Sequence, residues 1–237
     1  MMGTAEGLNG AVANAVGFFK ESREPHALLW LAVMHRRFGI EQFADALQRY
    51  DRILTEQPAQ APLRRVLRRF ADRDNPLQPD DWDAVTDPSD RLLVCGLYCD
   101  RVGLPRSFAE MLHKAASAGG YYLPHVILVW FWIRENGCSV ALPDGFMERV
   151  YKASAAIIDH DASIVSDLRL EVAAFLHLVG QGALVNRVFV ERVLASQNAD
   201  GGWGQARDAA GTSDWHSTVL GLLLLLQLNP PLASLEP

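Results

Sequence analysis

Four segments of this chain have the length of a helix and an apolar character on nearly every face. They begin near residues 89, 122, 166 and 213, and amphipathic segments alternate with them. A helix that is apolar all round must be covered on all sides by other elements. The chain from Asp87 onward therefore predicts an inner layer of apolar helices covered by an outer layer of amphipathic ones.

The apolar segments recur about every 33 to 47 residues, which is typical of stacked helical hairpins in a solenoid or a closed ring. Three of them open with the same pair of residues: Ser89-Asp90, Ser166-Asp167 and Ser213-Asp214. Serine is a favoured N-cap, and aspartate suits the positive end of a helix dipole. The first 75 residues do not keep the period. A stack of the HEAT type leaves both helices of each pair half exposed, which fits the apolar segment from Tyr121 to Glu135 poorly.

A corner precedes the last apolar segment. An amphipathic segment ends at Gln197, and Gly201 and Gly202 stop it and permit a tight reversal. Trp203 lies at the reversal, and Ser213 then restarts a helix that runs to Leu228. The outer helix, the corner and the buried inner helix form one supersecondary unit.

The corner sequence Gln-Asn-x-Asp-Gly-Gly-Trp-Gly, from Gln197 to Gly204, resembles the QW repeat of squalene-hopene cyclases and related terpenoid cyclases. It is also similar to the Gly-Gly-Phe/Trp repeat of protein prenyltransferase β subunits. The resemblance implies an all-α fold, the α/α toroid, in which inner and outer helices alternate around a central cavity. It also implies that Gln197 and Trp203 lock the corner. Because the chain is shorter than a usual six-hairpin toroid, the implied ring is reduced or incomplete, or is completed by a partner.

The composition is that of one globular, all-helical domain spanning residues 1–237. Hydrophobic residues make up 49% of the chain and charged residues 21%. We expect irregular N-terminal helices in residues 1–75 and repeating hairpins in residues 87–229. The net charge of −6 disfavours binding to nucleic acid, which requires neutralisation of phosphates.

The three cysteines, Cys95, Cys99 and Cys138, form no even set and contain no Cys-x-x-Cys pair. They predict free thiols and a cytoplasmic location. Residues 1–10 lack the features of a signal peptide. The longest apolar run, Val219 to Leu226, is shorter than the ~20 residues that span a bilayer, so we expect no transmembrane segment.

Polar residues concentrate in the first turns of the apolar segments. If these helices run parallel, their N-termini gather at one mouth of the cavity, where helix dipoles, arginine and histidine favour an anion. The candidates for acid chemistry are Asp90, Asp167, Asp214 and His216. The candidates for ligand contacts are His26, Trp30, Arg91, Tyr121, Tyr122, His125, Arg169 and Trp215. The alternative is that the Ser-Asp pairs serve only as helix caps.

The stretch Asp214-x-His216-Ser217-Thr218 resembles the Asp-x-x-His-Thr stretch of protein prenyltransferases, and that resemblance implies a zinc ligand at His216. The Asp-x-Cys that supplies the family's other ligands has no counterpart in this sequence. Only Cys95 and Cys99 are left to complete a site, and a role as small core residues is the favoured interpretation of both. We assign no metal site; the cofactor stays open, with zinc as the less favoured option.

The Asp-x-Asp-Asp acid of class II terpenoid cyclases is missing from the sequence, so classical isoprenoid cyclisation is not expected and catalysis is left open. The first functional hypothesis is binding or transformation of a hydrophobic, isoprenoid-like small molecule in a central cavity. The alternative hypothesis is a non-catalytic helical-repeat scaffold that binds a protein partner or a second copy of itself.

Overall fold

The computed structural model describes residues 5–58, 61–204 and 212–228. Within these ranges the chain forms α-helices, short 3-10 turns and no β-strand, so the prediction of an all-α protein is confirmed. The α-helices are α1 (Ala5–Phe18), α2 (Pro25–Phe38), α3 (Ala46–Glu56), α4 (Ala61–Leu67), α5 (Pro79–Asp83), α6 (Pro88–Leu97), α7 (Cys99–Val102), α8 (Phe108–Ala118), α9 (Tyr122–Glu135), α10 (Phe146–Asp159), α11 (Asp167–Leu178), α12 (Arg187–Ala195) and α13 (Trp215–Leu228).

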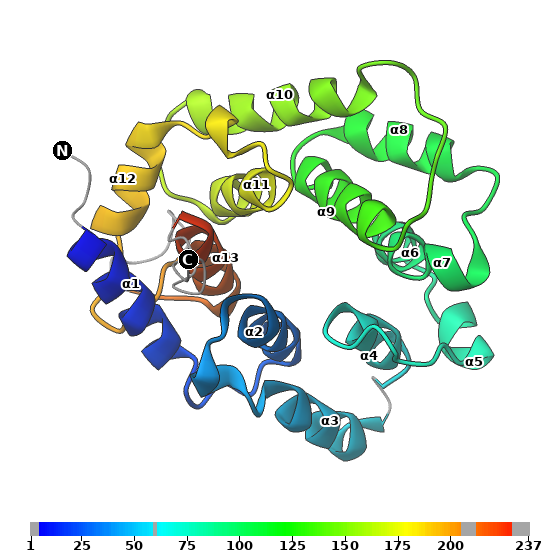
Figure 1. Ribbon diagram of the computed structural model, residues 1–237, viewed down its shortest axis with the longest axis horizontal. Helices are drawn as coiled ribbons and strands as arrows, with labels where there is room; N and C mark the ends of the chain where they lie inside the picture. Colours follow the sequence, from blue (N-terminus) through cyan, green and yellow to red (C-terminus); the bar gives the residue numbers. More distant parts are fainter. Residues whose placement is uncertain (1–4, 59–60, 205–211, 229–237) are drawn as a thin grey trace, which may run out of the picture.

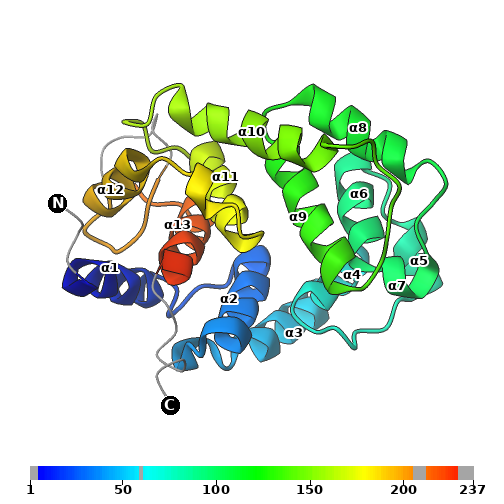
Figure 2. The ribbon, with the colours of Figure 1, turned by 45° about the horizontal axis from the view of Figure 1, so that its top comes forward.

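The helices lie in two layers. In Figure 1, α2, α4, α6, α9, α11 and α13 are seen close to end-on in the middle, and the other helices lie around them. Within the inner layer α9 contacts α11, α11 contacts α13, and α13 contacts α2, as Figure 2 also shows. Along the chain, outer and inner positions alternate, except that α7 and α8 are consecutive and both lie in the outer layer. The alternation includes α1 to α4, where the sequence shows no period.

Burial follows the hydrophobic pattern of the sequence. In α13, every residue from Ser217 to Leu226 is buried, and α11 and α9 are covered over most of their length. In α12, an outer helix, only Phe189 and Val193 are buried. The helices that are apolar on all sides are therefore the inner ones, because only the inner layer is covered from both directions.

No helix in the described ranges has both the length and the apolar character needed to cross a membrane. The most apolar one, α13, has 14 residues, whereas a bilayer needs ~20. Its apolar surface is covered by the neighbouring helices α1, α2 and α11.

Trp203 joins the last outer helix to the last inner one. Its side chain is 1% exposed, and its indole Nε1 donates a hydrogen bond of 2.8 Å to the carbonyl oxygen of Val193 in α12. Its backbone N–H donates to Oγ1 of Thr218 in α13, at 3.0 Å. Gly221 packs on the indole so closely that a Cβ there would lie 2.7 Å from the ring. The loop 205–211 that follows the corner is outside the described residues.

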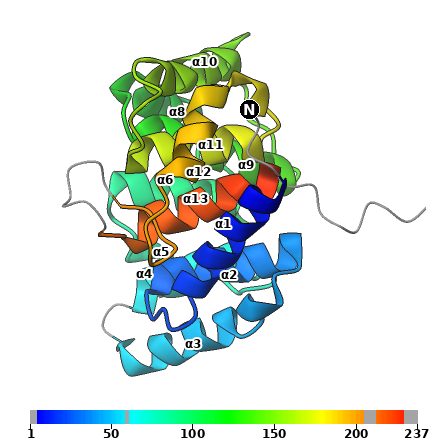
Figure 3. The same cartoon turned by 90° about the vertical axis from the view of Figure 1, so that its left-hand side faces the viewer.

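Gln197 connects this corner to the first helix. Its Nε2 donates to the carbonyl oxygens of Ala11, at 2.8 Å, and Gly201, at 2.9 Å. Nδ2 of Asn14 donates to Oε1 of Gln197 at 3.4 Å. Figure 3 shows α1 beside α12 and α13, and contacts join α1 to both. The corner therefore holds the first helix against the last hairpin.

The prediction that the serine side chains of the Ser-Asp pairs make the capping hydrogen bonds of the inner helices is wrong. In α6 the capping side chain is Asp87, which accepts hydrogen bonds from the backbone N–H groups of Ser89 and Asp90. In α13 it is Asp214, which accepts from the backbone N–H of Ser217 at 2.8 Å. Ser166 does occupy the N-cap position of α11, as predicted, but its side chain makes no capping hydrogen bond to the described residues. The side chains of Asp90 and Asp167 therefore do not serve as the helix caps of α6 and α11.

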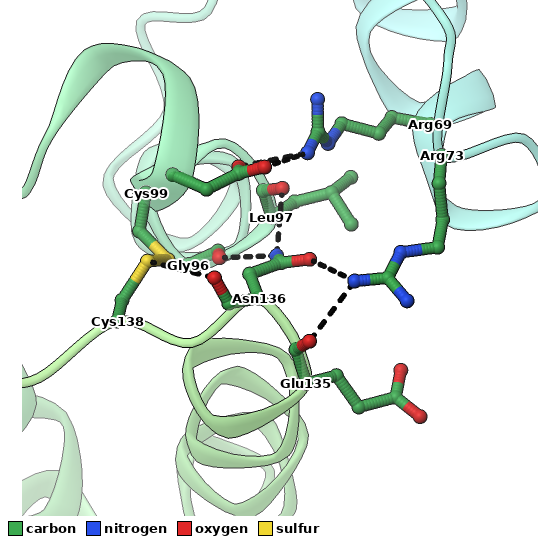
Figure 4. The surroundings of a disulfide bond; sticks show 9 residues. Arg69, Arg73, Gly96, Leu97, Cys99, Glu135, Asn136 and Cys138 are labelled. Atoms are coloured by element: carbon green, nitrogen blue, oxygen red, sulfur yellow. Dashed lines mark hydrogen bonds and ion pairs between the residues drawn. A yellow bond between two sulfur atoms is a disulfide. The ribbon is translucent and has the colours of Figure 1, made fainter.

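Two of the three cysteines form a disulfide, so the prediction of three free thiols is wrong. Cys99, at the start of α7, is bonded to Cys138, which follows α9, and their Cα atoms lie 6.2 Å apart (Figure 4). Next to the bond, Nδ2 of Asn136 donates to the carbonyl oxygen of Leu97 at 3.1 Å. The end of α9 is thus fixed to the end of α6. Disulfides persist mainly in oxidising compartments, so the cysteines no longer argue for the cytoplasm.

Candidate functional site

The inner helices enclose a pocket of about 180 Å³. Residues that line it come from α2, α4, α6, α9, α11 and α13 and from the turn after α4. Of the predicted site residues, the pocket brings together His26, Trp30, Asp90, His125, Trp215 and His216. These residues are far apart in the sequence and meet because the first turns of the inner helices lie around one common space.

The pocket changes from polar to aromatic along the helices. In α2, His26 lies in the first turn and Trp30 follows four residues later; in α11, Glu171 and Phe175 have the same spacing. Side chains four residues apart lie on the same face of a helix, one above the other. On α2 and α11 the polar group therefore lies nearer the start of the helix and the aromatic ring one turn further along, whereas Trp215 lies at the start of α13.

Four aromatic rings form the floor. Trp30 is stacked on Phe175, with centroids 5.6 Å apart, and meets the edge of Phe70 at 4.4 Å. Phe70 in turn contacts Trp132, at 5.4 Å between centroids. These four rings form a continuous series of contacts and all line the pocket, so they limit the space between the inner helices.

His216 lines the pocket and is paired with Asp167, which is not itself among the lining residues. Nδ1 of His216 lies 2.7 Å from Oδ1 of Asp167. Burial by itself lowers the pKa of His216, but the hydrogen bond and the charge of Asp167 outweigh it, so this pKa lies above its ordinary value. Burial raises the pKa of Asp167, yet His216 brings that pKa below its ordinary range. Both shifts favour the charged pair.

Other hydrogen bonds fix the position of Asp167. The hydroxyl of Ser217 donates to Oδ1 of Asp167 at 3.2 Å. Tyr121 lies close enough to Asp167 to be affected by its charge. Burial is the largest cause, and this charge the second, that together raise the pKa of Tyr121 to about 12. Nε2 of His216 has no hydrogen-bond partner among the residues that the structure describes. Within the described ranges, the arrangement holds the imidazole by Nδ1 alone.

A second carboxylate–histidine pair lies beside the first. Nε2 of His125 is 3.4 Å from Oε1 of Glu171, and its Nδ1 is 3.2 Å from the hydroxyl of Ser89. Glu171 is 2% exposed, and its Oε2 has no hydrogen-bond partner in the described part of the chain. Sequence reasoning missed Glu171. The available signal was its position, because it lies four residues after Asp167 and therefore on the same face of the helix.

Asp90 is the third acid near the mouth of the pocket. It is half-buried in the first turn of α6, and burial, together with the nearby charge of Asp87, raises its pKa. No lysine or arginine of the described part of the chain lines the pocket.

The remaining candidates are not brought into the pocket. Arg91 lies over the ring of Trp82, 4.0 Å from its centroid, and faces the outside of α6. Arg169 donates to the carbonyl oxygen of Ile157. Tyr122 is 45% exposed, and Asp214 is used as a helix cap. The expected contribution of arginine to an anion site at the mouth is therefore not found.

The described residues contain no group of three or more His, Cys, Asp or Glu side chains placed to hold a metal ion. The pair considered for completing a zinc site is also unsuitable, because Cys99 is in the disulfide and Cys95 is a buried thiol.

A larger groove lies on the outside of the molecule. It has a volume of about 900 Å³ and is formed by α5, α6, α7, α8 and the connections between them. Apolar side chains make up much of its wall, among them Leu77, Trp82, Leu104 and Met111. Its position on the outer face separates it from the pocket between the inner helices.

Comparison with protein-family models, with curated protein sequences and with solved structures finds no match for this chain.

Proposed function

We propose that this protein is an α/α toroid that binds a small, largely apolar molecule in the central pocket. The observation that carries the proposal is the change within one pocket from histidine and carboxylate side chains at the mouth to stacked aromatic rings at the floor. Ligand sites are typically apolar concavities with a few placed polar groups. The Gly-Gly-Trp corner supports the toroid, since it joins an outer to an inner helix as the resemblance implies.

The volume limits the size of the ligand. A pocket of about 180 Å³ corresponds to roughly six water molecules at about 30 Å³ each. Drug-sized ligands occupy pockets of about 300–1,000 Å³. A short isoprenoid unit therefore suits the pocket better than a long chain.

If the bound molecule is transformed, His216 is the group that exchanges a proton with it. Asp167 holds Nδ1, so Nε2 is the nitrogen available to a ligand. The pKa of His216 is raised, which keeps an imidazolium available as a proton donor closer to neutral pH.

The experiment is calorimetry with dimethylallyl alcohol, geraniol and farnesol, which share a head group and increase in length. We expect the shorter alcohols to bind and farnesol to bind at least about tenfold more weakly, because it exceeds the pocket. His216→Ala should keep the helical circular dichroism and weaken binding, whereas His160→Ala, at the exposed end of α10, should not. Equal binding of all three alcohols to both variants would argue against the pocket.

The alternative, a scaffold for a protein partner or a second copy, has the outer groove in its favour, because that groove is the larger hollow and is lined by apolar side chains. Native mass spectrometry of the purified protein separates the two proposals. A co-purifying small molecule supports the central pocket, and a tight dimer without one supports the scaffold.

A further inference from the structure

The acids of the central pocket are only partly neutralised. Asp167, which does not line the pocket, is paired with the lining residue His216, so this pair carries no net charge when both groups are ionised. Glu171 and Asp90 are the acids that line the pocket, and no arginine or lysine is among the lining side chains in the described ranges. The pocket therefore carries an excess of carboxylate over permanent positive charge.

Glu171 shows that the pocket is incomplete as a polar site. Its side chain is 3% exposed, Oε1 faces His125, and Oε2 has no partner among the described residues. A buried carboxylate oxygen without a hydrogen-bond donor is destabilising, so such groups are normally paired. A positively charged group bound next to Glu171 would supply the missing interaction.

The floor of the pocket also suits a cation. Trp30, Phe70, Trp132 and Phe175 line it, and Trp215 lies at the rim against His26, with ring centroids 6.1 Å apart. The faces of aromatic rings attract cations, tryptophan most strongly. Carboxylates combined with aromatic rings recognise an ammonium group that carries apolar substituents. An anionic head group would instead meet Glu171 and Asp90.

We propose that the central pocket binds a small organic cation, a protonated or quaternary amine, whose charge lies near Glu171 and Asp90 and whose apolar part contacts the aromatic floor. This inference rests on the proposed function, since it names the ligand class of the same pocket. In this proposal Glu171 selects ligands that carry a positive charge, and the aromatic rings limit the size of the ligand.

The test compares two probes of the same shape, choline and its neutral isostere 3,3-dimethylbutan-1-ol, by calorimetry. The wild-type protein should bind choline roughly tenfold more tightly than the alcohol. Glu171→Gln, which keeps the size of the side chain, should bring the two affinities together. Glu110→Gln removes the same charge from the exposed face of α8 and should leave the preference unchanged.

Each outcome decides the inference. If the alcohol binds as tightly as choline to the wild-type protein, the cation proposal is overturned and the pocket itself is retained. If neither probe nor any prenyl alcohol binds, the proposed function fails as well. A preference for choline that persists in Glu171→Gln overturns the role of Glu171. If Glu171→Gln does not fold, Asp90→Asn serves for the same comparison, since that acid is half-buried at the rim.

Discussion

At the scale of single residues, the packing of position 221 against Trp203 requires a glycine. A methyl group at position 221 would lie 2.7 Å from the indole, and the indole is held by its hydrogen bond to α12. We predict that Gly221→Ala lowers the free energy of unfolding by about 1–3 kcal/mol through overpacking. Urea denaturation followed by circular dichroism measures the change.

The matched control is Gly10→Ala in α1, where nothing lies within 4 Å of the added Cβ. This substitution should raise the free energy of unfolding by about 0.5–1 kcal/mol, because alanine favours a helix interior over glycine. An equal loss at both positions would mean that the contact with Trp203 is not the cause.

The pair of His216 and Asp167 makes stability depend on pH. The raised pKa of His216 gives a contribution that is complete below about pH 6.5 and is lost as the pH rises through the folded-state pKa. The depressed pKa of Asp167 gives a contribution that is present above about pH 3.9 and is lost as the pH falls through the folded-state pKa. The pair therefore stabilises the fold most between about pH 4 and 6.5.

We predict that His216→Gln lowers the free energy of unfolding by about 1 kcal/mol near pH 5 and by less near pH 9. Urea denaturation at the two pH values measures this difference between wild type and variant. His160→Gln, at an exposed position, should show no such dependence. A loss of equal size at both pH values would exclude a charged pair.

At the scale of elements, Gln197 holds α1 in place through the carbonyl oxygen of Ala11. We predict that Gln197→Ala speeds hydrogen exchange of the α1 amides about fivefold, as expected for the loss of roughly 1 kcal/mol from a local contact. The α3 amides should be unaffected and serve as an internal reference. Gln48→Ala, an exposed glutamine on α3, is the control variant. Faster exchange in every helix would show global destabilisation instead.

The sequence predicts the inner helices well because burial on all sides requires apolar residues on all faces. The segment from Ser213 to Leu228 contains α13, which is buried from Ser217 to Leu226. It predicts N-caps less well, since the cap of α6 is Asp87, two residues before Ser89, and Asp87 accepts hydrogen bonds from the backbone N–H groups of Ser89 and Asp90. Local composition shows that a helix starts near a position, but competition within one turn decides which side chain caps it.

The candidate site was predictable where it depends on helix starts and unpredictable where it depends on side-chain direction. His26 and His216 follow from their places in first turns. Arg91 is in the first turn of α6 as well, but its guanidinium stacks on Trp82, outside the pocket. The pairing of Cys99 with Cys138 depends on the return of the chain after α9, which cysteine spacing does not encode.

At the scale of the whole molecule, the disulfide closes a covalent loop with a sequence separation of 39 between its cysteines. Such a loop restricts the unfolded chain, and we predict that reduction lowers the free energy of unfolding by about 2–4 kcal/mol. Urea denaturation with and without a phosphine reductant measures the change. The double variant Cys99→Ser, Cys138→Ser should not respond to the reductant.

Thiol titration in urea without reductant provides an independent check. One reactive thiol is expected, from Cys95, since it is the free cysteine of the described chain. Three reactive thiols would contradict the disulfide.

The contact between α1 and the Gly-Gly-Trp corner joins residues 183 positions apart, as the hydrogen bond from Asn14 to Gln197 shows. Closing so long a segment costs more chain entropy than forming any hairpin, so this contact belongs at the end of the folding reaction. On the ribosome, α1 and α2 are made long before α13, which they both contact. A nascent chain that lacks α13 therefore exposes the apolar faces of its first two helices until synthesis reaches residue 228, and those faces are where a chaperone would bind.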